Sequence, residues 1–162
     1  MADHRTGVLF VCTGNICRSP TAEGVFRALA AKRGVLERLR IDSAGTLDYH
    51  AGEPPDPRAI EHAARRGYDL SALRARQVVR ADFDEFAWIL AMDRTHLRLL
   101  KAQAPGGTPA RVTMFTDRSK GWRGLDVPDP YYGGPGGFEQ VLDIAEEACE
   151  GLMEAVLARA PR

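Results

Sequence analysis

Residues 8–20 read VLFVCTGNICRSP, and this stretch decides the fold. Its first four residues form a continuous apolar run, which is typical of a strand that is buried on both faces. From Pro20 onwards apolar residues recur at helical spacing, which predicts a helix that ends at Gly34. The residues between these two segments therefore follow the carboxyl end of a strand and precede the start of a helix.

The same alternation of strand and helix patterns continues along the chain. Short apolar stretches predict strands at 41–44, 88–92 and 112–115. Helical periodicity predicts helices over 58–66, after Asp93 as a capping residue, and from Phe138 to the C-terminus, with loops at 45–57 and 121–137. This order is typical of an α/β fold, a parallel sheet with helices on both faces, and we expect a single domain over 1–162.

The composition is that of an ordinary globular protein and excludes several classes. Lys+Arg and Asp+Glu both number 22, a formal net charge of zero, whereas nucleic-acid-binding proteins normally carry a basic excess. No apolar run is long enough to cross a bilayer, and the N-terminus has no signal-peptide pattern. Three cysteines, an odd number, do not indicate a disulfide framework. We therefore expect a cytoplasmic protein with no membrane or nucleic-acid partner.

The segment 12–19 combines the features of an anion-binding loop. A helix N-terminus presents unpaired backbone N–H groups and the positive end of the helix dipole, both of which attract anions. Gly14 lets the chain bend, Asn15 tolerates left-handed geometry, and a loop of this length can curl its amides around one phosphate. Arg18 adds a planar guanidinium that can hold two phosphate oxygens. The expected phosphate-binding residues, besides Arg18, are Thr13, Gly14, Asn15, Ile16, Cys17 and Ser19.

Cys12 would lie beneath this loop as a nucleophile. The helix dipole and Arg18 favour the thiolate, which is the reactive form of cysteine. Ser19 can donate a hydrogen bond to the sulfur and so help it leave in a later step. Taken alone, Cys12 and Arg18 also fit a buried strand-end cysteine and a surface cation, but the whole motif favours two catalytic residues.

The motif CTGNICRS at 12–19 resembles that of the low-molecular-weight protein tyrosine phosphatase family. The likeness extends through DSAGT at 42–46, ARQ at 75–77 and DPYY at 129–132, so it spans nearly the whole chain. It implies a four-stranded parallel sheet, a phosphate-binding loop between the first strand and the first helix, no metal or other cofactor, and a phosphocysteine intermediate. The implied partners are tyrosine-phosphorylated proteins and a cognate tyrosine kinase, with the protein a monomer or weakly self-associating.

The resemblance implies that Asp129 is the proton donor. Expelling tyrosine from phosphate releases a phenolate whose conjugate acid has a pKa of about 10, so a general acid helps. Pro128 and Pro130 restrict the backbone of Asp129. The same carboxylate would later accept a proton from the water that attacks the phosphocysteine. From the residues alone an Asx-type turn is the better interpretation of Asp129, so the catalytic role comes from the resemblance.

Three tyrosines and one serine complete the implied site. Tyr49, Tyr131 and Tyr132 match family positions that line or border the substrate cleft, where aromatic walls suit an aromatic substrate. The alternative for these tyrosines is simple exposure on loops. Ser43 matches a serine that hydrogen-bonds Asn15 and fixes the shape of the loop.

Several positions leave alternatives open. The family often has a histidine where this chain has Leu73, so either another residue supports Asn15 or the loop is held more loosely. Cys17 fits both a reversible disulfide with Cys12 and a small apolar group packed under the loop. The three histidines His50, His62 and His96 look like loop and helix-surface residues.

The principal rival function is that of a thioredoxin-coupled arsenate reductase, which resembles this chain in fold and phosphate-loop motif. Such reductases need a downstream cysteine pair, and here only Cys149 follows the motif. A non-catalytic phosphotyrosine-binding module would lack Cys12, Arg18 or Asp129, and all three are present. We therefore predict an enzyme that hydrolyses phosphotyrosine and small aryl phosphates.

Overall fold

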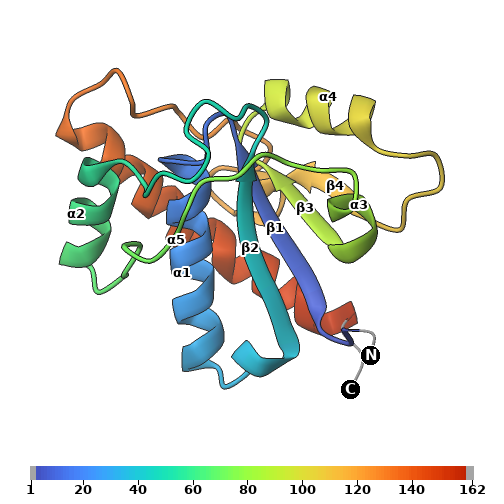
Figure 1. Cartoon of the computed structure of the whole chain (residues 1–162). Helices are drawn as coiled ribbons and strands as arrows, with labels where there is room; N and C mark the ends of the chain where they lie inside the picture. The colour runs from blue at the N-terminus through green and yellow to red at the C-terminus, as the bar shows by residue number, and fades with distance from the viewer. Residues whose placement is uncertain (1–2, 160–162) are drawn as a thin grey trace.

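The computed structural model describes residues 3–159 and contains a four-stranded parallel sheet in the order β2-β1-β3-β4 (Figure 1). The strands are β1 (Thr6–Cys12), β2 (Leu39–Gly45), β3 (Trp88–Ala91) and β4 (Arg111–Met114). The helices are α1 (Arg18–Lys32), α2 (Pro57–Arg65), α3 (Asp82–Glu85), α4 (Arg94–Gln103) and α5 (Pro135–Arg159), with 3-10 turns η1 (Leu36–Arg38) and η2 (Phe115–Arg118). The predicted parallel α/β fold is confirmed.

Helices cover both faces of the sheet. Successive residues of β1 point to opposite faces, so each face receives apolar side chains from this strand. Val8 and Phe10 belong to a large apolar core with residues of α1 and α5, while Leu9 and Val11 join a smaller core with residues of α3 and α4. Figure 1 shows α1 and α5 on one side of the sheet and α4 on the other. A strand buried on both faces explains the uninterrupted apolar run in its sequence.

The strand order places a crevice beside the carboxyl end of β1. The chain leaves β1 toward α1 on one face of the sheet, and leaves β3 toward α4 on the other. In open parallel sheets such a reversal separates the two connections, and ligands bind there. The Cys12–Arg18 segment follows β1 and Asp93 follows β3, so both lie at this point.

The start of α4 agrees with its predicted cap, whereas α1 and α5 begin earlier than predicted. Asp93 caps α4 by accepting a hydrogen bond from the His96 amide, as predicted. The predicted loop at 121–137 is wrong at its end, because α5 already begins at Pro135. Proline has no N–H to lose at the first helical position and its φ suits a helix, so Pro135 is compatible with a helix start.

Two histidines predicted on helix surfaces are buried, so this prediction is wrong for them. His62 hydrogen-bonds Glu139 and stacks on Phe138, with ring centroids 5.5 Å apart. His96 is only 2% exposed and its ring reaches Thr13. Both rings have polar partners from distant parts of the chain, which local periodicity does not reveal.

Within residues 3–159, no helix combines the length and apolar character that a membrane crossing requires.

Candidate active site

The loop after β1 is held against the end of β2. Cys12 ends β1 and is 3% exposed, and Asn15 has a left-handed backbone with φ of 58°. The carbonyls of Cys12 and Thr13 accept hydrogen bonds from the Thr46 and Leu47 amides at 2.9 and 3.0 Å. A side chain at Gly45 would come within 2.7 Å of the Thr13 carbonyl oxygen, so glycine permits this close approach.

A chain of hydrogen bonds runs from the backbone of Arg76 to the sulfur of Cys12. The Arg76 amide donates to Asn15 Oδ1 at 3.1 Å, and this contact orients the Asn15 side chain. Asn15 Nδ2 then donates to Ser19 Oγ at 2.8 Å. Ser19 Oγ lies 3.0 Å from Cys12 Sγ. Because Ser19 accepts from Asn15, its own proton is available for a hydrogen bond to the sulfur.

A buried glutamate ends the second branch of this chain. Asn15 Nδ2 also donates to Ser43 Oγ at 2.9 Å, and Ser43 donates to Glu23 Oε1 at 2.7 Å. Burial raises the pKa of Glu23, against hydrogen bonds from Ser43 and Arg27 that lower it. Arg27 pairs with the other carboxylate oxygen at 2.8 Å. The carboxylate therefore has a cation beside it and keeps Ser43 oriented as a donor.

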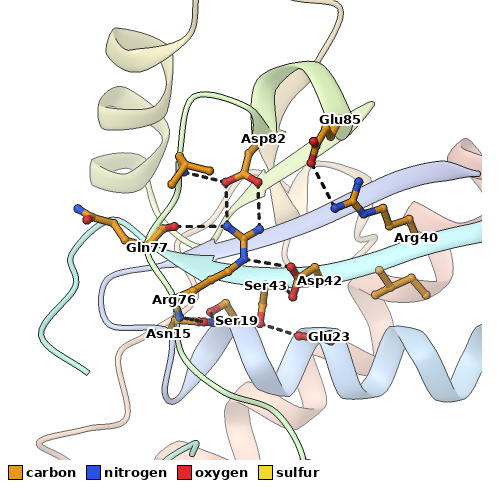
Figure 2. Close-up of polar contacts among 12 residues, drawn as sticks. Asn15, Ser19, Glu23, Arg40, Asp42, Ser43, Arg76, Gln77, Asp82 and Glu85 are labelled. Atoms are coloured by element: carbon orange, nitrogen blue, oxygen red, sulfur yellow. Dashed lines mark hydrogen bonds and ion pairs between the residues drawn. The ribbon is translucent and has the colours of Figure 1, made fainter. Parts of the chain in front are cut away.

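Asn15 is held in place without a histidine at position 73. Asn15 has three partners, Ser19, Ser43 and the Arg76 amide, although no histidine stands at position 73. The Arg76 side chain is itself anchored, by Asp82 through two hydrogen bonds of 3.0 Å and by Asp42 at 3.0 Å. Figure 2 shows these two carboxylates bound to the Arg76 guanidinium, while the backbone of Arg76 meets Asn15. A different residue thus supports Asn15.

Arg18 begins α1 and is 4% exposed, so it is not a surface cation. Its Nη1 donates to Asp93 Oδ2 and to the Val127 carbonyl, both at 3.0 Å. Its Nη2 lies 3.5 Å from Thr13 Oγ1 and 3.7 Å from Asp129 Oδ2. Burial alone would raise the pKa of Asp93, but hydrogen bonds from the His96 amide and Arg18 bring it below its usual value. The Arg18–Asp93 pair therefore remains ionised near neutral pH.

Asp129 lies on a loop and is held more loosely than Arg18. Its side chain is 45% exposed. Its Oδ1 accepts a hydrogen bond from the Tyr131 amide at 3.0 Å, which is the Asx-type turn, while Oδ2 faces Arg18. Asp129 can therefore form the turn and also face the phosphate loop, because its two carboxylate oxygens have different neighbours.

A cleft of about 260 Å³ lies over these residues. It brings together Cys12, Thr13, Gly14, Ile16, Cys17, Arg18, Tyr49, Asp129, Tyr131 and Tyr132 from the sequence-based candidates. Asn15, Ser19 and Ser43 do not line it and are buried behind the loop. Tyr131 and Tyr132 pack edge to face at the rim, with ring centroids 4.9 Å apart.

Cys17 is buried among apolar residues at the same loop, and the cysteines of residues 3–159 are all free thiols. Burial raises the pKa of Cys17, and the nearby Asp56 and Cys12 add to this effect. The Cys17 thiol is therefore neutral in this structure and packs as an apolar group. A disulfide with Cys12 stays a prediction.

Sequence reasoning missed five residues around the site. Leu47 and His50 line the cleft, and His50 Nδ1 lies 2.7 Å from Glu53. Asp93 and His96 contact the loop through their side chains, and Glu23 reaches it through Ser43. Of these residues, Asp93 could have been found from the sequence. It caps a helix directly after a strand, and loops at the carboxyl edge of a parallel sheet meet.

Comparisons with known proteins agree with this geometry. A profile of the family described as low molecular weight phosphotyrosine protein phosphatase matches residues 7–161. A low molecular weight protein-tyrosine-phosphatase of Streptomyces coelicolor is 45% identical over 152 residues, covering 92% of each chain. The human low molecular weight phosphotyrosine protein phosphatase is 40% identical over 157 residues, covering 95% of this chain and 98% of that protein. A crystal structure of a protein tyrosine phosphatase from Entamoeba histolytica aligns with a TM-score of 0.89 at 38% identity, over 94% of this chain and 97% of the other.

Proposed function

This chain belongs to the low molecular weight phosphotyrosine protein phosphatase family, and from that premise we propose that it hydrolyses phosphotyrosine through a phosphocysteine intermediate on Cys12. The observation that carries the proposal is the meeting of three groups in one cleft. Ser19 Oγ lies 3.0 Å from the Cys12 sulfur, the Arg18 guanidinium is buried beside the same loop, and Asp129 faces Arg18 at 3.7 Å.

In the first step the phosphate enters the cleft and is bound by the backbone N–H groups of the loop and by Arg18. The Cys12 thiolate attacks phosphorus, and the bond from phosphorus to the phenolic oxygen breaks. Protonated Asp129 gives its proton to that oxygen, so neutral tyrosine leaves. The amides and Arg18 stabilise the charge on the transferring phosphoryl group.

In the second step the Asp129 carboxylate accepts a proton from water as the water oxygen attacks the phosphocysteine. The phosphorus–sulfur bond breaks, inorganic phosphate forms, and Cys12 returns as a thiolate that accepts the Ser19 hydrogen bond. Asp129 is then protonated again and ready for the next substrate. The cycle uses groups of this chain and water, so we expect activity without a metal or other cofactor.

We propose the same division of roles for the other site residues. Thr13, Gly14, Ile16 and Cys17 supply the lining of the phosphate loop, and Ser43 supports it through Asn15. Tyr49, Tyr131 and Tyr132 form an aromatic wall suited to a phenyl ring. The substrates would be tyrosine-phosphorylated proteins, with a cognate tyrosine kinase as a partner, and the chain would act as a single cytoplasmic domain, monomeric or weakly self-associating.

The test is hydrolysis of phosphotyrosine and phosphoserine peptides by wild type and by Cys12→Ser. Wild type is expected to release phosphate from phosphotyrosine alone, with and without EDTA. Cys12→Ser should abolish turnover and retain binding of inorganic phosphate, because the amides and Arg18 remain. Turnover by Cys12→Ser, or dependence on a metal, would contradict the mechanism.

A second arm of the same assay decides between phosphatase and arsenate reductase. Arsenate is offered together with reduced thioredoxin, and arsenite formation is measured. The expected result is none, since Cys149 lies in α5 and is buried away from the cleft. Catalytic arsenite production would favour the reductase.

A further inference from the structure

The contact between His96 and Thr13 joins α4 to the phosphate loop, and the proposed mechanism does not use it. His96 Nε2 lies 2.7 Å from Thr13 Oγ1. The imidazole is 2% exposed although it belongs to the first turn of a helix, whereas Thr13 is exposed and lines the cleft. A buried ring thus holds a hydroxyl group that directly follows the nucleophile.

The same turn of α4 also holds Arg18. One oxygen of Asp93 accepts from the His96 amide at 3.0 Å, and the other accepts from Arg18 Nη1 at 3.0 Å. Thr13 Oγ1 lies 3.5 Å from Arg18 Nη2. The two ends of the guanidinium are therefore held by Asp93 and by Thr13, and His96 fixes the position of the Thr13 hydroxyl.

The order Thr13, His96, Asp93 is that of the hydroxyl, imidazole and carboxylate in a nucleophilic triad. Two features argue against proton transfer through it. His96 Nδ1 lies 3.2 Å from Asp93 Oδ1 but is not aligned for a hydrogen bond, and it has no hydrogen-bond partner among residues 3–159. Burial, and then Arg18, lower the pKa of His96 to about 4, so the ring is neutral at pH 7 and a weak base. Such a group is suited to holding a hydroxyl in place.

We propose that His96 is a positioning residue of the phosphatase reaction, which keeps Thr13 and Arg18 in the geometry that grips the transferring phosphoryl group. This inference rests on the function proposed above for the loop. Loss of the contact would free one end of the Arg18 guanidinium. A hydrogen bond of this kind corresponds to a roughly two- to tenfold change in kcat/KM.

A double-mutant cycle with His96→Leu and Thr13→Val tests the coupling. Each single substitution is expected to lower kcat/KM on a phosphotyrosine peptide and to weaken inhibition by inorganic phosphate, both roughly two- to tenfold. The double variant is expected to be no worse than the more affected single variant, because both remove one contact. In a Thr13→Ser background, which retains the hydroxyl, His96→Leu should keep its full effect.

His62→Leu is the matched control, because it removes another buried histidine, on α2, that contacts Glu139 and Phe138. It is expected to lower Tm and to leave kcat/KM unchanged. Unchanged kinetics in His96→Leu, or additive effects in the double variant, would overturn the proposal. If His96→Leu does not fold, equal kcat/KM for Thr13→Val and Thr13→Ser would overturn it. An inactive wild type, or an active Cys12→Ser, would instead overturn the proposed function.

Discussion

The loop at 12–19 and the loop that carries Asp129 line the same cleft, but the protein holds them very differently. In the first, Asn15, Arg18 and Ser19 are almost completely buried, and each has hydrogen-bond partners on other elements. In the second, Asp129 is 45% exposed, and its side chain accepts one hydrogen bond, from the neighbouring Tyr131 amide. One region is fixed by the core of the fold, and the other by a turn of its own.

This difference matches what each region does in the proposed cycle. Donors that stabilise a transferring phosphoryl group are most effective when they need no reorganisation, so a buried and supported loop suits them. A general acid and base must gain and lose a proton in every turnover, and contact with water makes that exchange possible.

Replacing Asp129 by asparagine should have the largest effect outside Cys12. Asparagine can still accept from the Tyr131 amide, so the turn is retained while the transferable proton is lost. We expect kcat to fall about 10²- to 10⁴-fold for aryl phosphates with poor leaving groups and less for those with good ones. The measurement is a plot of kcat against the pKa of the leaving phenol for both enzymes.

Asp126→Asn is the control for that experiment, since Asp126 is an exposed carboxylate of the same loop that accepts from the Arg94 amide. It should leave the dependence on leaving group unchanged. An equal loss on good and poor leaving groups with Asp129→Asn would remove Asp129 from the role of proton donor.

Acid should destabilise the folded protein through the buried imidazole of His96. Its pKa is 6.5 in the unfolded chain and about 4 in the folded protein, so between these values only the unfolded state binds the proton. The contribution is therefore present above pH 6.5 and is lost as the pH falls toward 4, by up to about 3 kcal/mol. Chemical denaturation of wild type and His96→Leu at several pH values measures it, and the gap between their unfolding free energies should narrow with acid.

Two other acids titrate nearby in both proteins, the buried Glu23 and the half-buried Asp93, and His96 itself contributes to the lowered pKa of Asp93. The raised pKa of Glu23 gives a contribution of opposite sign, present at low pH and lost as the pH rises. Asp93, with a lowered pKa, loses its contribution only as the pH falls below its usual range. Parallel stability curves for wild type and His96→Leu would show that His96 is not buried as a neutral ring.

Removing the Ser43 hydroxyl should weaken the loop from behind. Ser43→Ala removes the donor to Glu23 Oε1 and one of the two acceptors of Asn15 Nδ2, in a buried site. We expect a loss of about 1–3 kcal/mol in the free energy of unfolding, accompanied by a lower kcat. Ser71→Ala, at an exposed serine bonded to Asp69, should change stability by less than about 0.5 kcal/mol. Similar losses in both variants would mean that the loop does not depend on this support.

The smallest effect is expected at the rim. Tyr132 is 91% exposed and packs against Tyr131 alone among the aromatic rings of residues 3–159. Tyr132→Ala should raise KM for a phosphotyrosine peptide about two- to threefold and leave kcat near that of wild type, since edge-to-face contacts contribute little on an exposed surface. A large loss of kcat would place Tyr132 closer to the chemistry than its exposure indicates.

Local patterns in the sequence predicted the parts of this site that are local in the fold. The apolar run before Cys12, the glycine and asparagine of the loop, and the helix after Pro20 are neighbours along the chain, so their meeting follows from β1 and α1 alone. The role of Asp129 came from the family resemblance, because nothing in its spacing tells which side of the sheet its loop crosses.

The support of the loop was not predictable in this way. His96 of α4 and the backbone of Arg76 contact the loop directly, while Glu23 reaches it through Ser43, and these contacts form only once distant segments have packed together. His96 has a polar ring near a helix start, which is also typical of an exposed position, and its burial depends on the packing of α4 over β3. The start of α5 at Pro135 was missed because glycines on both sides of the proline resemble a loop.

The phosphocysteine intermediate is tested by looking for a phosphoryl group on Cys12 during turnover. Asp129→Asn enzyme mixed rapidly with an aryl phosphate that has a good leaving group should accumulate the intermediate, because the water that attacks it lacks a base. Quenching and mass spectrometry of the peptide that contains Cys12 should show the added phosphoryl group, at most one per chain, and none in Cys12→Ser. Release of phosphate with no modified Cys12 at any time, or a phosphoryl group on another residue, would contradict the account.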